Sequence, residues 1–179
     1  TGYDVIFYGD ASGALAMWDT SADSLLVRGA TADAAGSTGT LVLQTAQVSV
    51  EDGDILGRID FNAPLETQGS DAILAGAAIW AEADATFTAS VNNTELVFAT
   101  ATTTVAAEKM RLDSSGNLGI GVATPASLLH VAGTVQVGVD GTGHDVQFFG
   151  DTASRYMLWD ESADALRFTD STTIYIGAS

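Results

Sequence analysis

Residues 1–27 and residues 142–168 are two copies of one sequence, and this repeat limits the possible folds more than any other feature of the chain. The first copy reads TGYDVIFYGDASGALAMWDTSADSLLV, and the second reads TGHDVQFFGDTASRYMLWDESADALRF. The copies align without gaps at an offset of 141 residues, and 13 of the 27 positions are identical. Repetition at this scale favours a modular, extended assembly over a compact enzyme, and we expect the chain to be a slice of a longer repetitive protein.

Differences between the copies separate inward-facing from water-facing positions. Val5 and Phe7 recur in the second copy, whereas Ile6 is replaced by Gln147. Because successive side chains of a strand point to opposite faces, Val5 and Phe7 are predicted to point inward while position 6 tolerates water. In the same way Leu25 recurs, whereas Leu26 is replaced by an arginine.

The middle of each copy predicts a strand that is buried on both faces, with a tryptophan at its centre. Trp18 is identical in the two copies, and the positions of Leu15 and Met17 stay apolar. Gly9-Asp10 and Ser21-Ala22-Asp23 recur where turns are expected. Each copy is therefore predicted to form a β-meander. Its structural aromatic residues are Phe7 and Trp18 in the first copy, and Phe148 and Trp159 in the second.

The rest of the chain also has the pattern of short strands separated by turns. Strands are predicted at residues 41–50, 55–61, 77–83, 86–91, 95–100, 109–113, 118–121, 128–132, 134–139 and 173–176. A short turn or helix is predicted before the strand at 77–83, which has Ala78, Trp80 and Glu82 on one face, and a hairpin turn is predicted at Asn92-Asn93. The fold class is all-β, built of short antiparallel strands and repeated β-meanders.

Four segments follow from these patterns. Residues 1–29 are the first meander, residues 30–40 are a linker or loop, residues 41–133 are a central β domain, and residues 134–179 contain the second meander. Such a chain has many strand edges, whose unpaired N–H and C=O groups invite association, and oligomerisation is one way to cover them.

Charge and composition exclude several classes of function. The chain has 23 Asp and Glu against 6 Lys and Arg, for a net charge of −17, and no Lys or Arg lies between Arg58 and Lys109. A phosphate backbone or an anionic membrane would be repelled, so nucleic-acid binding is not expected. No apolar run is long enough for membrane insertion. Cysteine is absent, which removes disulfides, thiolate metal sites and cysteine nucleophiles.

Residues 108–133 carry a motif that resembles a known family. They read EKMRLDSSGNLGIGVATPASLLHVAG, which resembles a segment common in bacteriophage tail-fibre and related host-recognition proteins. The matching positions are Glu108, Met110, Arg111, Asp113, Gly116, Gly119, Ile120, Gly121, Pro125, Leu129, His130, Val131 and Gly133. Val122 stands where these proteins usually have threonine. The upstream stretch, from residues 54–61 through residues 83–86, also looks like the sheet that precedes this motif in such proteins, and together the resemblance covers about half of the chain.

The resemblance implies an elongated homotrimeric fibre segment on the virion surface, without enzymatic activity of its own. The implied partners are two further copies of the chain, other virion fibre proteins, and a glycan or protein of the host surface. Within the motif, Gly119 and Gly121 are expected to allow close backbone approach, and Pro125 to fix a turn before residues 128–131 re-enter the core. Arg111 and Asp113 are expected on one face of a strand, where they could pair with neighbours in the same chain or in another.

Candidates for chemistry are few, and no catalytic or cofactor-binding residue is predicted. Asp19 and Asp23 recur as Asp160 and Asp164, and calcium would suit clustered carboxylates. Turn hydrogen bonding explains the same residues without a metal. His130 is expected to be packed or hydrogen-bonded. Two alternatives to the fibre remain at this stage, a tailspike-type enzyme that depolymerises glycans and a subunit of a microbial surface filament.

Overall fold

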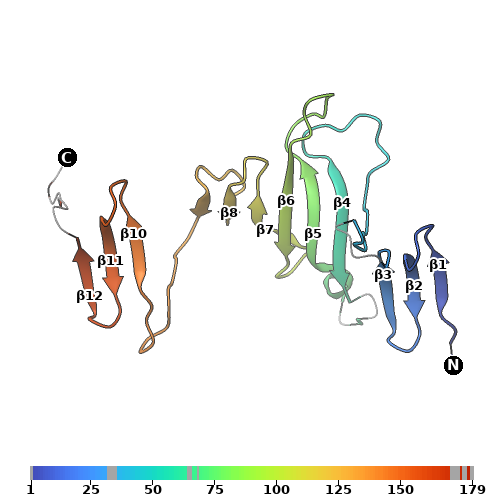
Figure 1. Cartoon of the computed structure of the whole chain (residues 1–179), viewed down its shortest axis with the longest axis horizontal. Helices are drawn as coiled ribbons and strands as arrows, with labels where there is room; N and C mark the ends of the chain where they lie inside the picture. Colours follow the sequence, from blue (N-terminus) through green and yellow to red (C-terminus); the bar gives the residue numbers. More distant parts are fainter. Residues whose placement is uncertain are drawn as a thin grey trace. The chain divides into compact units, whose positions relative to one another are not determined.

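The computed structural model describes residues 2–31, 36–63, 66–67, 69–169, 174 and 177. The chain divides into two compact units, Thr1–His130 and Val131–Ser179. Among the described residues there are three β-sheets and no α-helix, and every strand pair with a defined register is antiparallel (Figure 1). The predicted all-β class is therefore confirmed. The strand predicted at residues 173–176 falls largely outside the described residues, as do residues 32–35 of the predicted loop.

Each copy of the repeat forms a three-stranded antiparallel meander, as predicted. The first sheet has the order β1-β2-β3 and consists of β1 (Val5–Tyr8), β2 (Leu15–Asp19) and β3 (Ser24–Arg28). The second sheet has the order β10-β11-β12 and consists of β10 (Val146–Phe149), β11 (Tyr156–Asp160) and β12 (Ala165–Phe168). The two copies therefore share their strand order as well as their sequence pattern.

The turns of the two meanders have the same backbone conformation at equivalent positions. Asp23 and Asp164 both have positive φ, at 47° and 46°, and so do Gly13 at 83° and Ser154 at 63°. Aspartate tolerates the left-handed region better than most residues, because its short side chain bonds to nearby backbone groups. The recurring Ser-Ala-Asp sequence thus selects one turn geometry in both copies.

A six-stranded sheet in the order β4-β5-β6-β7-β8-β9 forms the centre of the chain. Its strands are β4 (Ile55–Asn62), β5 (Ala75–Ala83), β6 (Thr94–Thr100), β7 (Ala107–Leu112), β8 (Leu118–Ile120) and β9 (Leu129–Val131). A 3-10 helix at Asp71–Ile73 precedes β5, which confirms the short turn or helix predicted there. The division between the two units falls within β9.

Three predicted strands are wrong, because their residues find no extended partner. Residues 41–50 have no strand pairing, although their side chains alternate. Residues 86–91 form a tight turn closed by the bridge between Thr88 and Val91, so the chain reverses before the predicted Asn92-Asn93 turn. Residues 134–139 end in a second isolated bridge, from Val139 to Thr142.

The buried core is small and rich in alanine. It is formed by Ala78, Trp80, Val97, Ala99 and Ala106, of which Val97 is fully buried. Ala78 and Trp80 lie on one face of β5, as predicted, and the indole N–H of Trp80 donates to Glu82 Oε2 at 2.8 Å. Because alanine has little intrinsic preference for strands, the pairing of β5 with a neighbour on each side decides its conformation.

Candidate functional site

The register of the first meander places six apolar side chains together on one face. Val5 pairs with Trp18, which pairs with Leu25, and Phe7 pairs with Ala16, which pairs with Val27. Directly opposite residues of an antiparallel pair project from the same face. We call the surface formed by these six residues face A. The opposite surface, face B, carries the apolar residues Ile6, Tyr8, Leu15, Met17 and Leu26, with Arg28 opposite Leu15 and Asp19 opposite Ser24.

The second meander has an equivalent face A that is also entirely apolar. It consists of Val146, Phe148, Met157, Trp159, Leu166 and Phe168. Face B of this sheet has Gln147 and Arg167 opposite Leu158. Arg167 Nε lies 3.0 Å from Asp160 Oδ2, which gives face B an ion pair that the first copy lacks. The two surfaces of the meander therefore differ in character most clearly in the second copy.

The predicted core residues of both meanders are exposed in the single chain. Phe7 is 70% exposed and Phe148 58%, while the central Trp18 and Trp159 are 45% and 42% exposed. The prediction that the middle strand is buried on both faces is wrong within one chain. A three-stranded sheet buries a face only when a second layer packs on it, and little of the described chain covers these surfaces. The loop of residues 36–40 touches the β3 backbone near Val27 but leaves Leu25 63% exposed.

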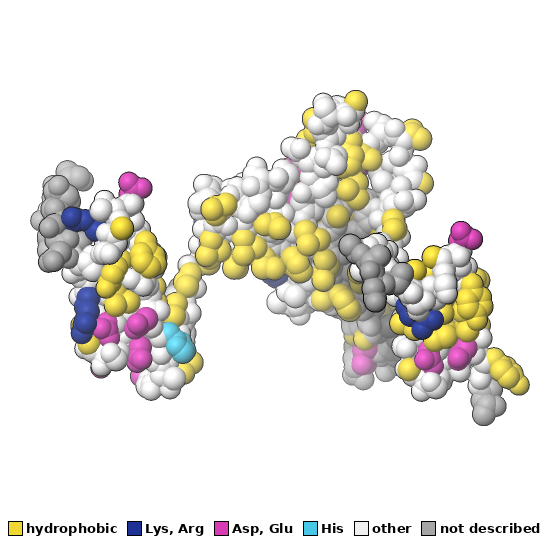
Figure 2. Space-filling model, in the orientation of Figure 1, with side chains coloured by type: hydrophobic (Ala, Val, Ile, Leu, Met, Phe, Trp, Pro, Cys, Tyr) yellow, Lys and Arg dark blue, Asp and Glu magenta, His cyan; other side chains and the backbone are white. Residues whose placement is uncertain are grey.

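The six-stranded sheet also has a broad apolar surface, which we call the open face. One row across β4 to β8 contains Ile59, Ile79, Phe98, Met110 and Ile120. The adjacent row contains Gly57, Ala81, Leu96, Leu112 and Leu118. Ile59, Leu96, Leu112 and Ile120 are each 40–43% exposed. Figure 2 shows hydrophobic side chains gathered over this sheet and over each meander.

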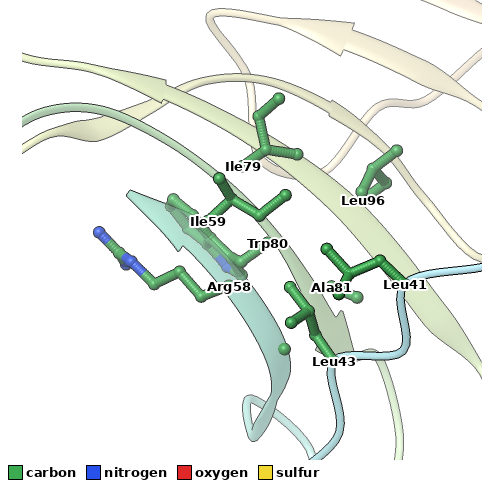
Figure 3. Close-up of a pocket in the computed structure, with 9 residues that line it drawn as sticks. Leu41, Leu43, Arg58, Ile59, Ile79, Trp80, Ala81 and Leu96 are labelled. Atoms are coloured by element: carbon green, nitrogen blue, oxygen red, sulfur yellow. The ribbon is translucent and has the colours of Figure 1, made fainter. Parts of the chain in front are cut away.

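A strap of irregular chain covers one end of the open face. Leu41 and Leu43, from the segment predicted as a strand, face Ile59, Ile79 and Leu96 across a pocket of about 260 Å³ (Figure 3). A Cβ added at Gly57 would lie 2.7 Å from Leu43 Cβ and 2.9 Å from the Leu43 carbonyl oxygen. Glycine at this position is therefore what allows the strap to cross β4. Six of the nine lining residues are aliphatic and the others are Gly57, Arg58 and Trp80, a lining that suits an apolar group better than a polar ligand.

The other surface of the sheet, the core face, combines the buried core with charged residues. Val97 and Trp80 lie there beside Glu95, whose exposed fraction is only 5%. The guanidinium of Arg111 donates from Nη1 to Glu95, and from Nε and Nη2 to the two carboxylate oxygens of Glu108 at 2.7 and 2.5 Å. Burial raises the pKa of Glu95 above its ordinary value, and the hydrogen bond from Arg111 opposes that shift. The hydrogen bond to Glu108 raises the pKa of Arg111.

A β-bulge creates this ion-pair cluster. Strand alternation alone would place Glu108 and Arg111, three residues apart, on opposite faces. The register of β7 against β6 shifts after Phe98, so that both Glu108 and Arg111 face the core side. On the edge strand β4, Arg58 binds Asp60 at 2.7 Å and lies over the Trp80 ring, 4.9 Å from its centroid. The predicted pairing of Arg111 is confirmed, with Glu95 and Glu108 as its partners.

Two of the four candidate metal residues, Asp19 and Asp160, form side-chain hydrogen bonds within the turns. Asp19 Oδ1 accepts hydrogen bonds from the Ser21 hydroxyl at 2.7 Å and from the Ser21 backbone N–H at 2.9 Å. In the second copy Asp160 Oδ1 accepts from the Ser162 hydroxyl at 2.8 Å. These bonds lower the pKa of both aspartates. Across the described ranges, no three His, Cys, Asp or Glu side chains gather into a set that could hold a metal ion.

The structural residues predicted in the family-like motif have identifiable local roles. Asp113 caps the turn that follows β7, because its carboxylate accepts the backbone N–H groups of Ser115 at 2.9 Å and of Asn117 at 2.8 Å. The bond from Asn117 lowers the pKa of Asp113. A Cβ at Gly119 would lie 2.4 Å from the Val122 carbonyl oxygen, which confirms the close approach. Gly121 has a positive φ of 71°.

The expectations for Pro125, for the segment after it and for His130 have different outcomes. Pro125 is half-buried and lies in the turn before β9. Leu128 and Leu129 are 77% and 60% exposed, so the prediction that this segment re-enters the core is wrong within one chain. His130 is hydrogen-bonded, as expected, because its Nδ1 accepts the backbone N–H of Ala126 at 3.2 Å.

Comparisons with known proteins do not indicate a function, so the chemistry of the apolar sheet faces is the main guide to it. No protein-family model matches the chain, and no curated protein is significantly similar to it. Within the part of the chain that the structure describes, no helix is long and apolar enough to cross a membrane. The distinctive features are therefore the two faces A and the open face.

Proposed function

We propose that this chain is a non-enzymatic structural segment of a homotrimeric bacteriophage fibre, exposed on the virion surface, which supports or mediates adhesion to the host. The observation that carries the proposal is the uncovered apolar surface on all three sheets of a chain with net charge −17. A strongly acidic surface keeps a protein soluble, whereas repeated apolar sheet faces require a covering layer. Copies of the same chain would supply that layer.

The motif at residues 108–133 supports the same proposal from the sequence. Its glycines and Asp113 build the turns that connect β7, β8 and β9. These strands continue the open face, since Met110 pairs with Ile120 and Leu112 with Leu118. The fibre-like motif thus lies in the part of the sheet whose apolar surface is not covered by the strap of Leu41 and Leu43.

The solution mass of the chain tests the proposal directly. Light scattering coupled to size-exclusion chromatography should give three times 18.3 kDa. A monomer would contradict the homotrimer and return the two alternatives, a glycan depolymerase and a surface filament subunit, to first place. Adhesion is tested separately by measuring sedimentation of the labelled trimer with bacterial cells of candidate hosts. Release of reducing sugar from host polysaccharide would instead indicate the depolymerase.

A further inference from the structure

We infer that face A of each meander, and not face B, is the surface against which another copy of this chain packs. The inference rests on the proposed homotrimer and assigns the contact within it. In the isolated chain the two faces are both exposed, so burial alone does not choose between them. Leu25 on face A is 63% exposed and Leu26 on face B is 39% exposed.

Comparing the two copies of the repeat distinguishes face A from face B. Four of the six residues of face A are identical in the two copies, and the other two positions stay apolar. None of the five apolar residues of face B in the first copy is identical in the second. On that face Ile6 is replaced by Gln147 and Leu26 by Arg167. Face A therefore retains the composition of a buried layer while face B accepts a charge.

The charge distribution favours a second copy as the occupant. The chain carries a net charge of −17, so two copies repel one another, and an uncharged contact surface keeps like charges from being brought close together. The six residues of each face A are uncharged, and each face presents a tryptophan between a valine and a leucine. Arg155 lies at the border of face A in the second copy, one residue before β11, where its backbone carbonyl accepts the N–H of Gly150. A basic partner would have no acidic group to bind on this surface, whereas an identical face offers apolar side chains of the same layout.

The exposed area is large enough for such an interface. From their exposed fractions, the side chains of each face A present apolar surface on the order of 400 Å². The two faces of one chain together approach the roughly 800 Å² that each partner contributes to a standard stable interface. Because aromatic residues at the centre of an interface carry much of the binding free energy, we expect Trp18 and Trp159 to dominate the contact.

Neighbouring leucines on one strand provide the test. Leu25→Arg places a charge on face A, and Leu26→Arg places the same charge one residue away on face B, where the second copy naturally has Arg167. The equivalent pair in the second copy is Leu166→Arg and Arg167→Leu. Each full-length variant is examined by light scattering over a dilution series, and circular dichroism confirms that the strands are retained.

Leu25→Arg and Leu166→Arg should weaken the association of the protomers, because each variant buries an unpaired charge in the contact. Their oligomers should dissociate at protomer concentrations at least tenfold higher than the wild-type oligomer does. Leu26→Arg and Arg167→Leu should keep the wild-type mass. If the wild type is trimeric but Leu25→Arg keeps that mass, or Leu26→Arg loses it, the assignment of face A is overturned while the fibre proposal stands. A monomeric wild type overturns the fibre proposal and the assignment with it.

Discussion

Replacing Arg111 by methionine is expected to destabilise the central sheet more than any change to an exposed ion pair. The substitution keeps much of the side-chain volume but leaves the Glu95 carboxylate without its partner. Arg111 and Glu95 have side chains that are only 12% and 5% exposed, so solvent screens the pair weakly. Removing one partner of a buried pair costs about 3 kcal/mol or more, because the remaining charge is desolvated and uncompensated.

The pH dependence of this loss distinguishes an unpaired charge from a simple packing defect. Burial already raises the pKa of Glu95, and the hydrogen bond from Arg111 opposes that effect. A carboxyl group whose pKa is higher in the folded state destabilises the fold once the pH rises above the unfolded value of 4.5. The cost of Arg111→Met should therefore be largest at neutral pH. It should shrink as the pH falls through the raised pKa and Glu95 takes up a proton.

Urea denaturation followed by circular dichroism measures the effect, with all variants at one protomer concentration because association contributes to stability. Arg167→Met is the control, since Arg167 is 59% exposed in its pair with Asp160 and its loss should cost at most about 1 kcal/mol. Adding Glu95→Gln to Arg111→Met should recover about 1–2 kcal/mol at neutral pH. A cost equal to that of the control, or one that does not change between pH 7 and pH 4, would refute the reasoning.

Three further predictions concern the core and the turns. Val97→Ala should lower the free energy of unfolding by about 2 kcal/mol, because it removes two methyl groups from a fully buried site; chemical denaturation measures this loss. Gly119→Ala should lower the thermal midpoint, since its Cβ would meet the Val122 carbonyl oxygen, whereas Gly133→Ala has open space and should leave the midpoint unchanged. Asp113→Ala should lower stability at neutral pH. The pKa of Asp113 is lowered from 3.8 in the folded state, so its carboxylate contributes to stability above pH 3.8 and this contribution is lost as the pH falls below 3.8. In an acid titration the variant should therefore lose less stability than the wild type.

Local features of this protein were predictable from the sequence where neighbouring residues decide the conformation. Both meanders and the strand at β5 with Trp80 on its buried face follow from alternation and from turn-forming residues. Asp113 was expected to pair with neighbours on a strand face, and it caps a turn instead. The recurring Asp19 also has the turn hydrogen bonds that its sequence context predicts. The motif at residues 108–133 rests instead on a family resemblance; the close approach predicted at Gly119 is confirmed, while the motif's functional meaning stays a proposal.

The failures share a different cause, which is that a strand exists only when another strand pairs with it. Residues 41–50 alternate as a strand would, yet they pair with no strand and instead form the strap over Gly57, although β4 is an edge strand of its sheet. The bulge of β7 was also unpredictable, since it depends on the register against β6. Without that bulge Glu108 would lie on the other face from Arg111.

The sequence alone determined which side chains of each meander share a face and which turns join the strands, because strand periodicity and turn chemistry act over a few residues. The tertiary structure decided what becomes buried, because burial requires a second layer that local sequence does not specify. It placed the small core around Val97 beside the ion pairs of Arg111, and it left Trp18 and Trp159 exposed. The residues that the sequence marks as inward-facing are therefore left uncovered in the part of the chain that the structure describes.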